Sequence, residues 1–183
     1  PLDSSAASDV YKRQSYEIEA LPQGERDQAR ALHLYTLVGE AATILKAVVP
    51  HRLIVWANGD LQYMDLFTEH AKDVDIFGTN VYRGESARDL FERVEKESGR
   101  AVVFTEFGSD AFNAREHRED GASQAYYLHK QWSEIYQQSR APGVGNAIGG
   151  FIFQWSDGWW KTKQDEDLDI HNTDASWPNG GYP

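Results

Sequence analysis

Along most of the chain, stretches in which apolar residues recur at helical spacing alternate with short apolar runs that are typical of strands. The stretch 24–49 repeats apolar residues near a 3.6-residue period and stops before Pro50, which predicts a long helix. The apolar positions of this helix are Ala29, Leu32, Leu34, Leu37, Val38, Ala41, Ala42 and Leu45. Three further amphipathic stretches predict helices at 60–73, 85–99 and 121–140, with Asp60 as an N-cap and Gly99 as a C-terminal signal.

Four short apolar runs lie between and after these helices, at 52–60, 74–82, 100–108 and 149–160. They are continuous rather than alternating, which is typical of strands in a parallel sheet that is covered on both faces. The order helix–strand, repeated four times, predicts an α/β fold, either a doubly wound sheet or a (β/α)8 barrel. Glycine motifs for phosphate binding do not follow any of these runs, which disfavours nucleotide-binding versions of the fold.

Each predicted strand carries polar or aromatic residues towards its C-terminal end. These residues are Trp56, Asn58, Asn80, Tyr82, Glu106, Gln154, Trp155 and Asp157. In a (β/α)8 barrel all of them converge on the face that bears the active site. A complete barrel takes about 250 residues, so four strands in 183 residues predict half a barrel, truncated at both ends. The polar loop 114–123, after the third predicted strand, would frame the mouth of the site.

Residues 1–14 have neither a helical nor a strand period, and they resemble translated adapter sequence. We interpret them as a non-native or disordered segment, with a natural flexible tail as the alternative. Residues 15–183 are then the partial barrel domain.

Composition narrows the choice of partners. The net charge of −11 disfavours nucleic acid and anionic membranes, because both select for Lys and Arg. The chain has no run of about 18 continuous apolar residues, so we expect no membrane insertion. It contains no cysteine. The histidines lack a metal-ligand spacing and the acidic stretch 165–174 lacks the glycine and glutamate of an EF-hand, so we expect no metal and no cofactor.

Three of the strand motifs carry a family resemblance: "GTNVYRG" at 78–84, "VVFTEFG" at 102–108 and "GGFIFQWSDGWW" at 149–160. They resemble the sixth, seventh and eighth strands of retaining glycoside hydrolases of the (β/α)8 clan with catalytic glutamates on strands 4 and 7. The nearest match is the catalytic domain of glycoside hydrolase family 2. The resemblance covers about residues 24–183 and implies the C-terminal half of a TIM barrel, about strands 5–8, acting on a carbohydrate substrate.

By this resemblance, Glu106 is the nucleophile, Tyr82 is the residue that hydrogen-bonds it, and Trp155 is the platform for the sugar. The remaining expected substrate contacts are Asn58, Asn80, Trp56, Gln154, Asp157 and His171. Retaining hydrolysis also requires a protonated carboxyl group about 5–5.5 Å from the nucleophile. In the family this group is a Glu that follows Asn on strand 4, and the sequence contains no Asn-Glu pair.

We therefore expect the acid/base to lie upstream of Tyr16 and the isolated chain to be inactive and poorly stable. The predicted activity is cleavage of β-linked glycosides by double displacement. The alternatives are a transglycosylase of the same fold and a non-catalytic carbohydrate-binding barrel. The resemblance suggests a secreted or periplasmic protein, but the sequence fixes neither the compartment nor the oligomeric state.

Overall fold

The structure, a computed structural model, describes residues 16–140 and 145–156. Its elements are α2 (Gln23–Val48), β1 (Val55–Gly59), α3 (Met64–His70), β2 (Ile76–Val81), α4 (Leu90–Ser98), β3 (Ala101–Phe107), β4 (Phe112–Asn113), β5 (Arg118–Glu119), α5 (Gly121–Gln137) and β6 (Ala147–Ile152). The predicted alternation of helices and strands is confirmed. The stretch 114–123 is not simply a loop, because it contains β5, which pairs with β4, and the start of α5.

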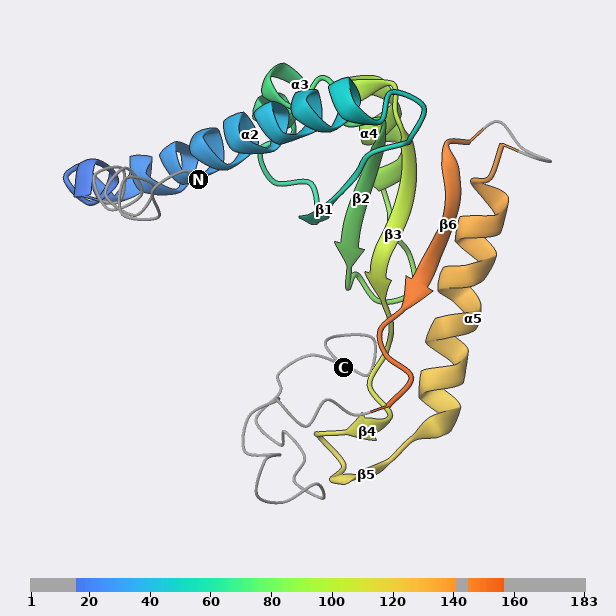
Figure 1. The fold of residues 1–183 in the computed structure, drawn as a ribbon. Helices are drawn as coiled ribbons and strands as arrows, with labels where there is room; N and C mark the ends of the chain where they lie inside the picture. The colour runs from blue at the N-terminus through green and yellow to red at the C-terminus, as the bar shows by residue number, and fades with distance from the viewer. Residues whose placement is uncertain (1–15, 141–144, 157–183) are drawn as a thin grey trace. The chain divides into compact units, whose positions relative to one another are not determined.

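The chain divides into two compact units, which are described separately. One unit contains the four-stranded sheet with α4 and α5, and the other contains α2 and α3. In the sheet the strand order is β1-β2-β3-β6 and all neighbours are parallel (Figure 1). The predicted parallel α/β sheet is therefore confirmed.

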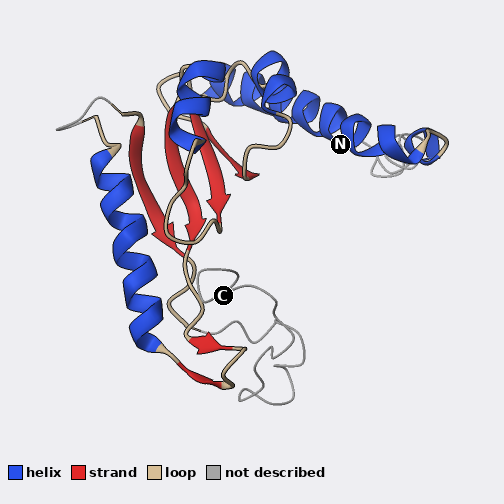
Figure 2. Ribbon diagram, turned by 180° about the vertical axis from the view of Figure 1, so that it is seen from behind, coloured by secondary structure: helices blue, strands red, loops and turns tan. Residues whose placement is uncertain are grey.

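One face of the sheet packs against α4 and α5, and we refer to it as the covered face (Figure 2). Phe91 of α4 stacks on Phe104 of β3, with ring centroids 5.3 Å apart. Trp132 of α5 meets Phe107 edge-on at 5.1 Å. Val102, Phe104 and Phe107 are at most 2 % exposed, so the apolar run of β3 provides the core of this unit.

We call the opposite side the open face. The residues that the register places there include Val55, Gly78, Asn80, Val103 and Thr105. Val55 is 44 % exposed, and the β6 residues Ile148 and Phe151 are 53 % and 67 % exposed. A parallel sheet is usually covered on both faces, so exposed apolar residues along its strands are unusual.

In the other unit, α3 packs against α2. The buried residues of α2 are Ala31, Tyr35, Val38, Gly39 and Ala42. Tyr35 meets Phe67 of α3 edge-on, with ring centroids 5.7 Å apart. A side chain at position 39 would collide with the backbone carbonyl group of His70, so glycine permits the close approach.

The predicted apolar face of α2 was therefore only partly right. Val38 and Ala42 are buried, but Leu32, Leu34, Leu37 and Leu45 are exposed by 39–63 %. The closest approach of the two helices is at Gly39, where the absence of a side chain lets the backbones come close. Among the described helices, α2 alone is long and apolar enough to cross a membrane by length and composition. Core helices and signal sequences meet the same criterion, so the absence of membrane insertion stays a prediction.

The sequence contains signals for three helix ends, at Pro50, Asp60 and Gly99, and the structure agrees with two of them. Helix α2 ends at Val48, two residues before Pro50, and α4 ends at Ser98 and is followed by Gly99 in the left-handed conformation. The prediction of Asp60 as an N-cap was wrong, because α3 begins only at Met64. The carboxylate of Asp60 instead accepts hydrogen bonds from the side chain of Arg83 and from the backbone N–H of Leu61.

Candidate active site

The centre of the candidate site is a hydrogen bond between Tyr82 and Glu106. The Tyr82 hydroxyl donates to Oε2 of Glu106 at 3.0 Å. Glu106 is the last residue but one of β3, and Tyr82 directly follows β2, so both lie at the carboxyl ends of neighbouring parallel strands. Both side chains are partly buried. The structure thus brings together the two residues for which the sequence predicted a mutual hydrogen bond.

A register shift between β2 and β3 gives Glu106 its direction. Thr79 pairs with Phe104, but the next residue, Asn80, pairs with Glu106, so Thr105 is extra. Strict alternation from Phe104 would have turned Glu106 towards the covered face. Instead Thr105 and Glu106 are both partly exposed in succession, and Phe107 returns to the core. Register shifts of this kind re-aim a side chain, here a carboxylate, away from an apolar core.

Asn80 lies beside the carboxylate in the same sheet. Its backbone is opposite Glu106, and its Oδ1 accepts a hydrogen bond of 2.7 Å from the hydroxyl of Thr105. Because Oδ1 is bound in this way, the side-chain orientation of Asn80 is restricted. The four residues Asn80, Tyr82, Thr105 and Glu106 form a polar group at the end of β2 and β3, which we call the carboxylate cluster.

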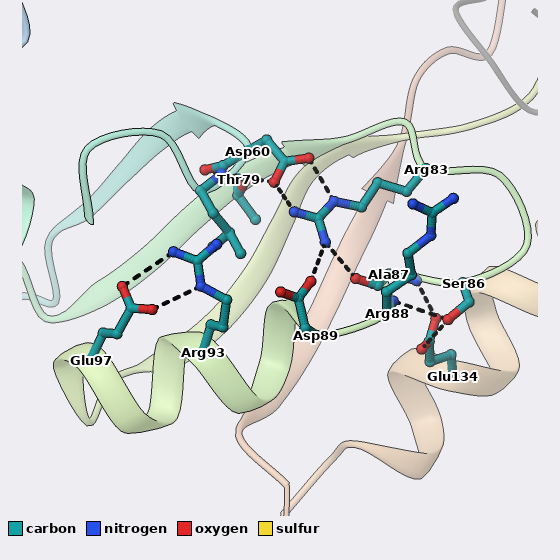
Figure 3. Close-up of polar contacts among 11 residues, drawn as sticks. Asp60, Thr79, Arg83, Ser86, Ala87, Arg88, Asp89, Arg93, Glu97 and Glu134 are labelled. Atoms are coloured by element: carbon teal, nitrogen blue, oxygen red, sulfur yellow. Dashed lines mark hydrogen bonds and ion pairs between the residues drawn. The ribbon is translucent and has the colours of Figure 1, made fainter. Parts of the chain in front are cut away.

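The loop that follows Tyr82 is fixed by its next residue, Arg83 (Figure 3). The guanidinium group donates to both carboxylate oxygens of Asp60, to the carbonyl oxygen of Ala87 at 2.7 Å and to Asp89 at 3.0 Å. Hydrogen bonds to Asp60 and Asp89 raise the pKa of Arg83, and the bond from Arg83 lowers the pKa of Asp89. This group, the arginine clamp, joins the loop after β2 to the end of β1.

Helix α5 holds the same loop from another side. Glu134 accepts hydrogen bonds from the hydroxyl of Ser86 at 2.9 Å and from the backbone N–H of Ala87 at 2.7 Å, as Figure 3 shows. One turn earlier, the amide nitrogen of Gln131 donates to the carbonyl oxygens of Gly84 and Gly108. Both strand ends that supply the carboxylate cluster are therefore tied to one helix.

Sequence reasoning missed these supporting residues. Arg83 offered a signal, because it follows Tyr82 directly in "NVYRG". Gln131 and Glu134 offered none, since polar residues within an amphipathic helix are ordinarily solvated.

Of the two expected substrate contacts on β1, Trp56 is placed differently from the prediction, whereas Asn58 lies near the end of the strand as predicted. Trp56 is the second residue of β1 and pairs with Phe77, whereas Glu106 pairs with Asn80, three residues further along β2. At about 3.3 Å per residue this is about 10 Å from the site along the strand, so the placement of Trp56 at the strand end was wrong. Asn58 is nearer to the end but is 6 % exposed, and its amide nitrogen donates to the Gly78 carbonyl at 3.2 Å.

The other expected contacts follow β6. Gln154 is partly buried and Trp155 is fully exposed, so the indole ring is available to a ligand. Asp157 and His171, and the acidic stretch 165–174, lie outside the described residues. Among the residues that the structure does describe, three or more His, Asp or Glu side chains do not gather in a way that could hold a metal ion.

The hydroxyl of Tyr82 holds one oxygen of the Glu106 carboxylate and so restricts the orientation of this side chain.

Comparison with known proteins gives no family: no family model matches the chain, and no curated protein is similar enough to be matched to it.

Proposed function

We propose that this chain is the nucleophile-bearing half of a retaining glycoside hydrolase that cleaves β-linked glycosides. The observation that carries the proposal is the hydrogen bond from Tyr82 to Glu106 at the carboxyl ends of adjacent parallel strands. A lone partly buried carboxylate at a strand end could serve only to bind a ligand. Its orientation by a hydroxyl donor, next to Asn80 and Thr105, is what a nucleophile requires.

In the proposed reaction, an oxygen of Glu106 attacks the anomeric carbon and forms a glycosyl ester as the glycosidic C–O bond breaks. The departing oxygen takes a proton from a second carboxyl group about 5–5.5 Å away. That group then removes a proton from water, which attacks the ester and releases the sugar and the free Glu106 carboxylate. We assign the second carboxyl group to an Asn-Glu pair on a preceding strand, in keeping with the family that the motifs resemble.

The proposed architecture, half of a (β/α)8 barrel, is supported by the two faces of the sheet. All four strands are parallel, and one face is covered by α4 and α5. The open face carries polar groups at its carboxyl end and exposed apolar residues such as Val55. A barrel that closes on itself would cover this face with the inward residues of the remaining strands.

Covalent trapping tests the proposal. The test uses a longer natural protein that contains this sequence and the preceding strands, treated with dinitrophenyl 2-deoxy-2-fluoro-β-glycosides. Dinitrophenolate leaves without a proton, and fluorine slows hydrolysis of the ester, so the glycosyl enzyme should accumulate. Peptide mapping by mass spectrometry should place the sugar on Glu106. The variant Glu106→Gln should not be labelled, and Tyr82→Phe should be labelled roughly tenfold to a hundredfold more slowly.

Labelling at another residue would contradict the assignment, as would an unlabelled protein that demonstrably binds the reagent. The 183-residue chain gives a second test, because it should show no turnover of ordinary β-glycosides. Turnover by this chain alone would contradict the half-site.

A further inference from the structure

The side chain of Gln131 links the two strand ends that carry the carboxylate cluster. Its Nε2 donates to the carbonyl oxygen of Gly84 at 2.9 Å and to that of Gly108 at 3.2 Å. Gly84 lies two residues after Tyr82, and Gly108 lies two residues after Glu106. The two N–H groups of one amide thus span the loops that follow the two residues of the central hydrogen bond.

The orientation of this amide is determined by its surroundings. Both neighbours are carbonyl oxygens, which accept hydrogen bonds and cannot donate them, so only the nitrogen end of the amide can face them. The side chain is 5 % exposed, and its Oε1 is buried without a hydrogen-bond partner. An unpaired buried carbonyl oxygen costs free energy, and the two bonds on the nitrogen offset that cost.

Backbone pairing alone does not fix the distance between Tyr82 and Glu106. The ladder between β2 and β3 ends at Val81 and Phe107, and its register shifts just before Asn80. Tyr82 therefore lies beyond the paired residues, in the loop that the arginine clamp and α5 hold. Gln131 hydrogen-bonds both of the loops beyond these strands, and Glu134 hydrogen-bonds the loop after β2.

We propose that Gln131 is a positioning residue: it holds together the two loops that follow the strand ends and so maintains the hydrogen bond from Tyr82 to Glu106. It acts through the backbone of Gly84 and Gly108, without touching the reacting atoms. The significance of this role for catalysis rests on the proposed function, but the geometric statement does not. Loss of the amide should allow the two loops to separate and should weaken the central hydrogen bond.

The test compares two variants on the same helix, Gln131→Met and Gln124→Met. Gln124 also donates to a backbone carbonyl oxygen, that of Ser109 at 3.1 Å, but it binds one loop only. The protein is the one used for trapping, labelled with 13C at the ζ carbon of tyrosine, and the Tyr82 signal is identified by its loss in Tyr82→Phe. The chemical shift of this carbon reports hydrogen bonding of the hydroxyl group.

We expect Q131M to move the Tyr82 signal towards that of a solvated tyrosine and Q124M to leave it in place. In the trapping reaction, Q131M should lower the rate constant of inactivation roughly tenfold to a hundredfold, with the binding constant of the reagent little changed. If Gln131 had a purely structural role, Q131M would lower the stability of the protein but would not lower the rate constant of inactivation while leaving the binding constant unchanged.

The outcomes separate the two proposals. If Tyr82 responds to Q131M but wild-type Glu106 is never labelled, the proposed function fails and the positioning role stands. If the Tyr82 signal is unchanged in folded Q131M, the positioning role is wrong whatever the labelling shows. Should Q131M fail to fold, Gln131→Asn carries the test, since it keeps the amide but is too short to reach both loops. An unchanged Tyr82 signal in Q131N, or failure of both variants to fold, overturns the inference.

Discussion

The covered and open faces of the sheet are built from the same strands but differ in how deeply their residues are buried and in how polar they are. On the covered face, Phe104 and Phe107 pack against aromatic residues of α4 and α5, and both are almost completely buried, as is Val102. On the open face, the same strand β3 presents Val103, Thr105 and Glu106, all of which are partly exposed. The covered face therefore supplies stability, and the open face supplies the candidate chemistry.

Because of the register shift at Thr105, the single strand β3 contributes both to the buried core and to the carboxylate cluster. Without it, Glu106 would follow Phe104 into the core, where an unpaired carboxylate is costly. The position of a carboxylate in the sequence of a strand therefore does not fix the face on which it lies.

The largest effect that we predict concerns the covered face. Replacing Phe104 with alanine should lower the free energy of unfolding by about 3–5 kcal/mol, because it removes a buried ring and leaves a cavity. The matched change on the open face, Val103→Ala, should cost no more than about 1 kcal/mol. Urea denaturation of the 183-residue chain measures both. Equal losses would contradict the difference between the faces.

The next effect concerns crowding on the open face. A Cβ at Gly78 would lie 2.7 Å from the carbonyl oxygen of Trp56 and 2.9 Å from the side chains of Val55 and Thr105. Gly78→Ala should therefore destabilise the chain by about 1–3 kcal/mol in urea denaturation. The control is Gly59→Ala in the adjacent strand, where a Cβ would meet nothing within 4 Å. If both substitutions were tolerated, side chains on the open face would not be packed against the backbone at Gly78.

A smaller effect is expected at the arginine clamp. Arg83→Met should lower the free energy of unfolding by about 1–2 kcal/mol, since it leaves Asp60 and the carbonyl of Ala87 without their strongest donor. Arg93→Met, which breaks an ion pair with Glu97 within α4, should cost less than about 0.5 kcal/mol. If Arg83→Met were as stable as Arg93→Met, the arginine clamp would contribute nothing measurable, and the loop after Tyr82 would be held by α5 alone.

The smallest effect is a pH dependence at the start of α5. Hydrogen bonds from the backbone N–H and hydroxyl group of Ser123 lower the pKa of Asp120. Because the folded-state pKa lies below the unfolded value of about 3.9, this stabilisation is present above that pH and is lost as the pH falls through the folded-state pKa. Asp120→Ala should therefore lower the melting temperature at pH 7, and the gap from the wild type should narrow towards pH 3. A gap that widened on acidification would contradict the sign of the shift.

Sequence reasoning was most successful where the determinants are local. The order of the elements, the parallel class of the sheet and the end of α4 at Gly99 all follow from short patterns. It failed at Asp60 and at Trp56, and it was only partly right about the apolar face of α2. In each case the outcome depends on a partner distant in the sequence: Arg83 for Asp60, the pairing with β2 for Trp56, and the backbone of His70 for Gly39.

By itself, therefore, the sequence determined the elements and placed Tyr82 and Glu106 at the ends of successive strands, because propensity and apolar period act over a few residues. Only the tertiary structure decided the direction of Glu106, through the register shift between β2 and β3. It also decided the tie through Gln131, because a side chain on one helix reaches two loops that are separated from it and from each other by many residues. The physical reason is that strand register and long-range hydrogen bonds depend on the pairing of whole elements, which no local pattern records.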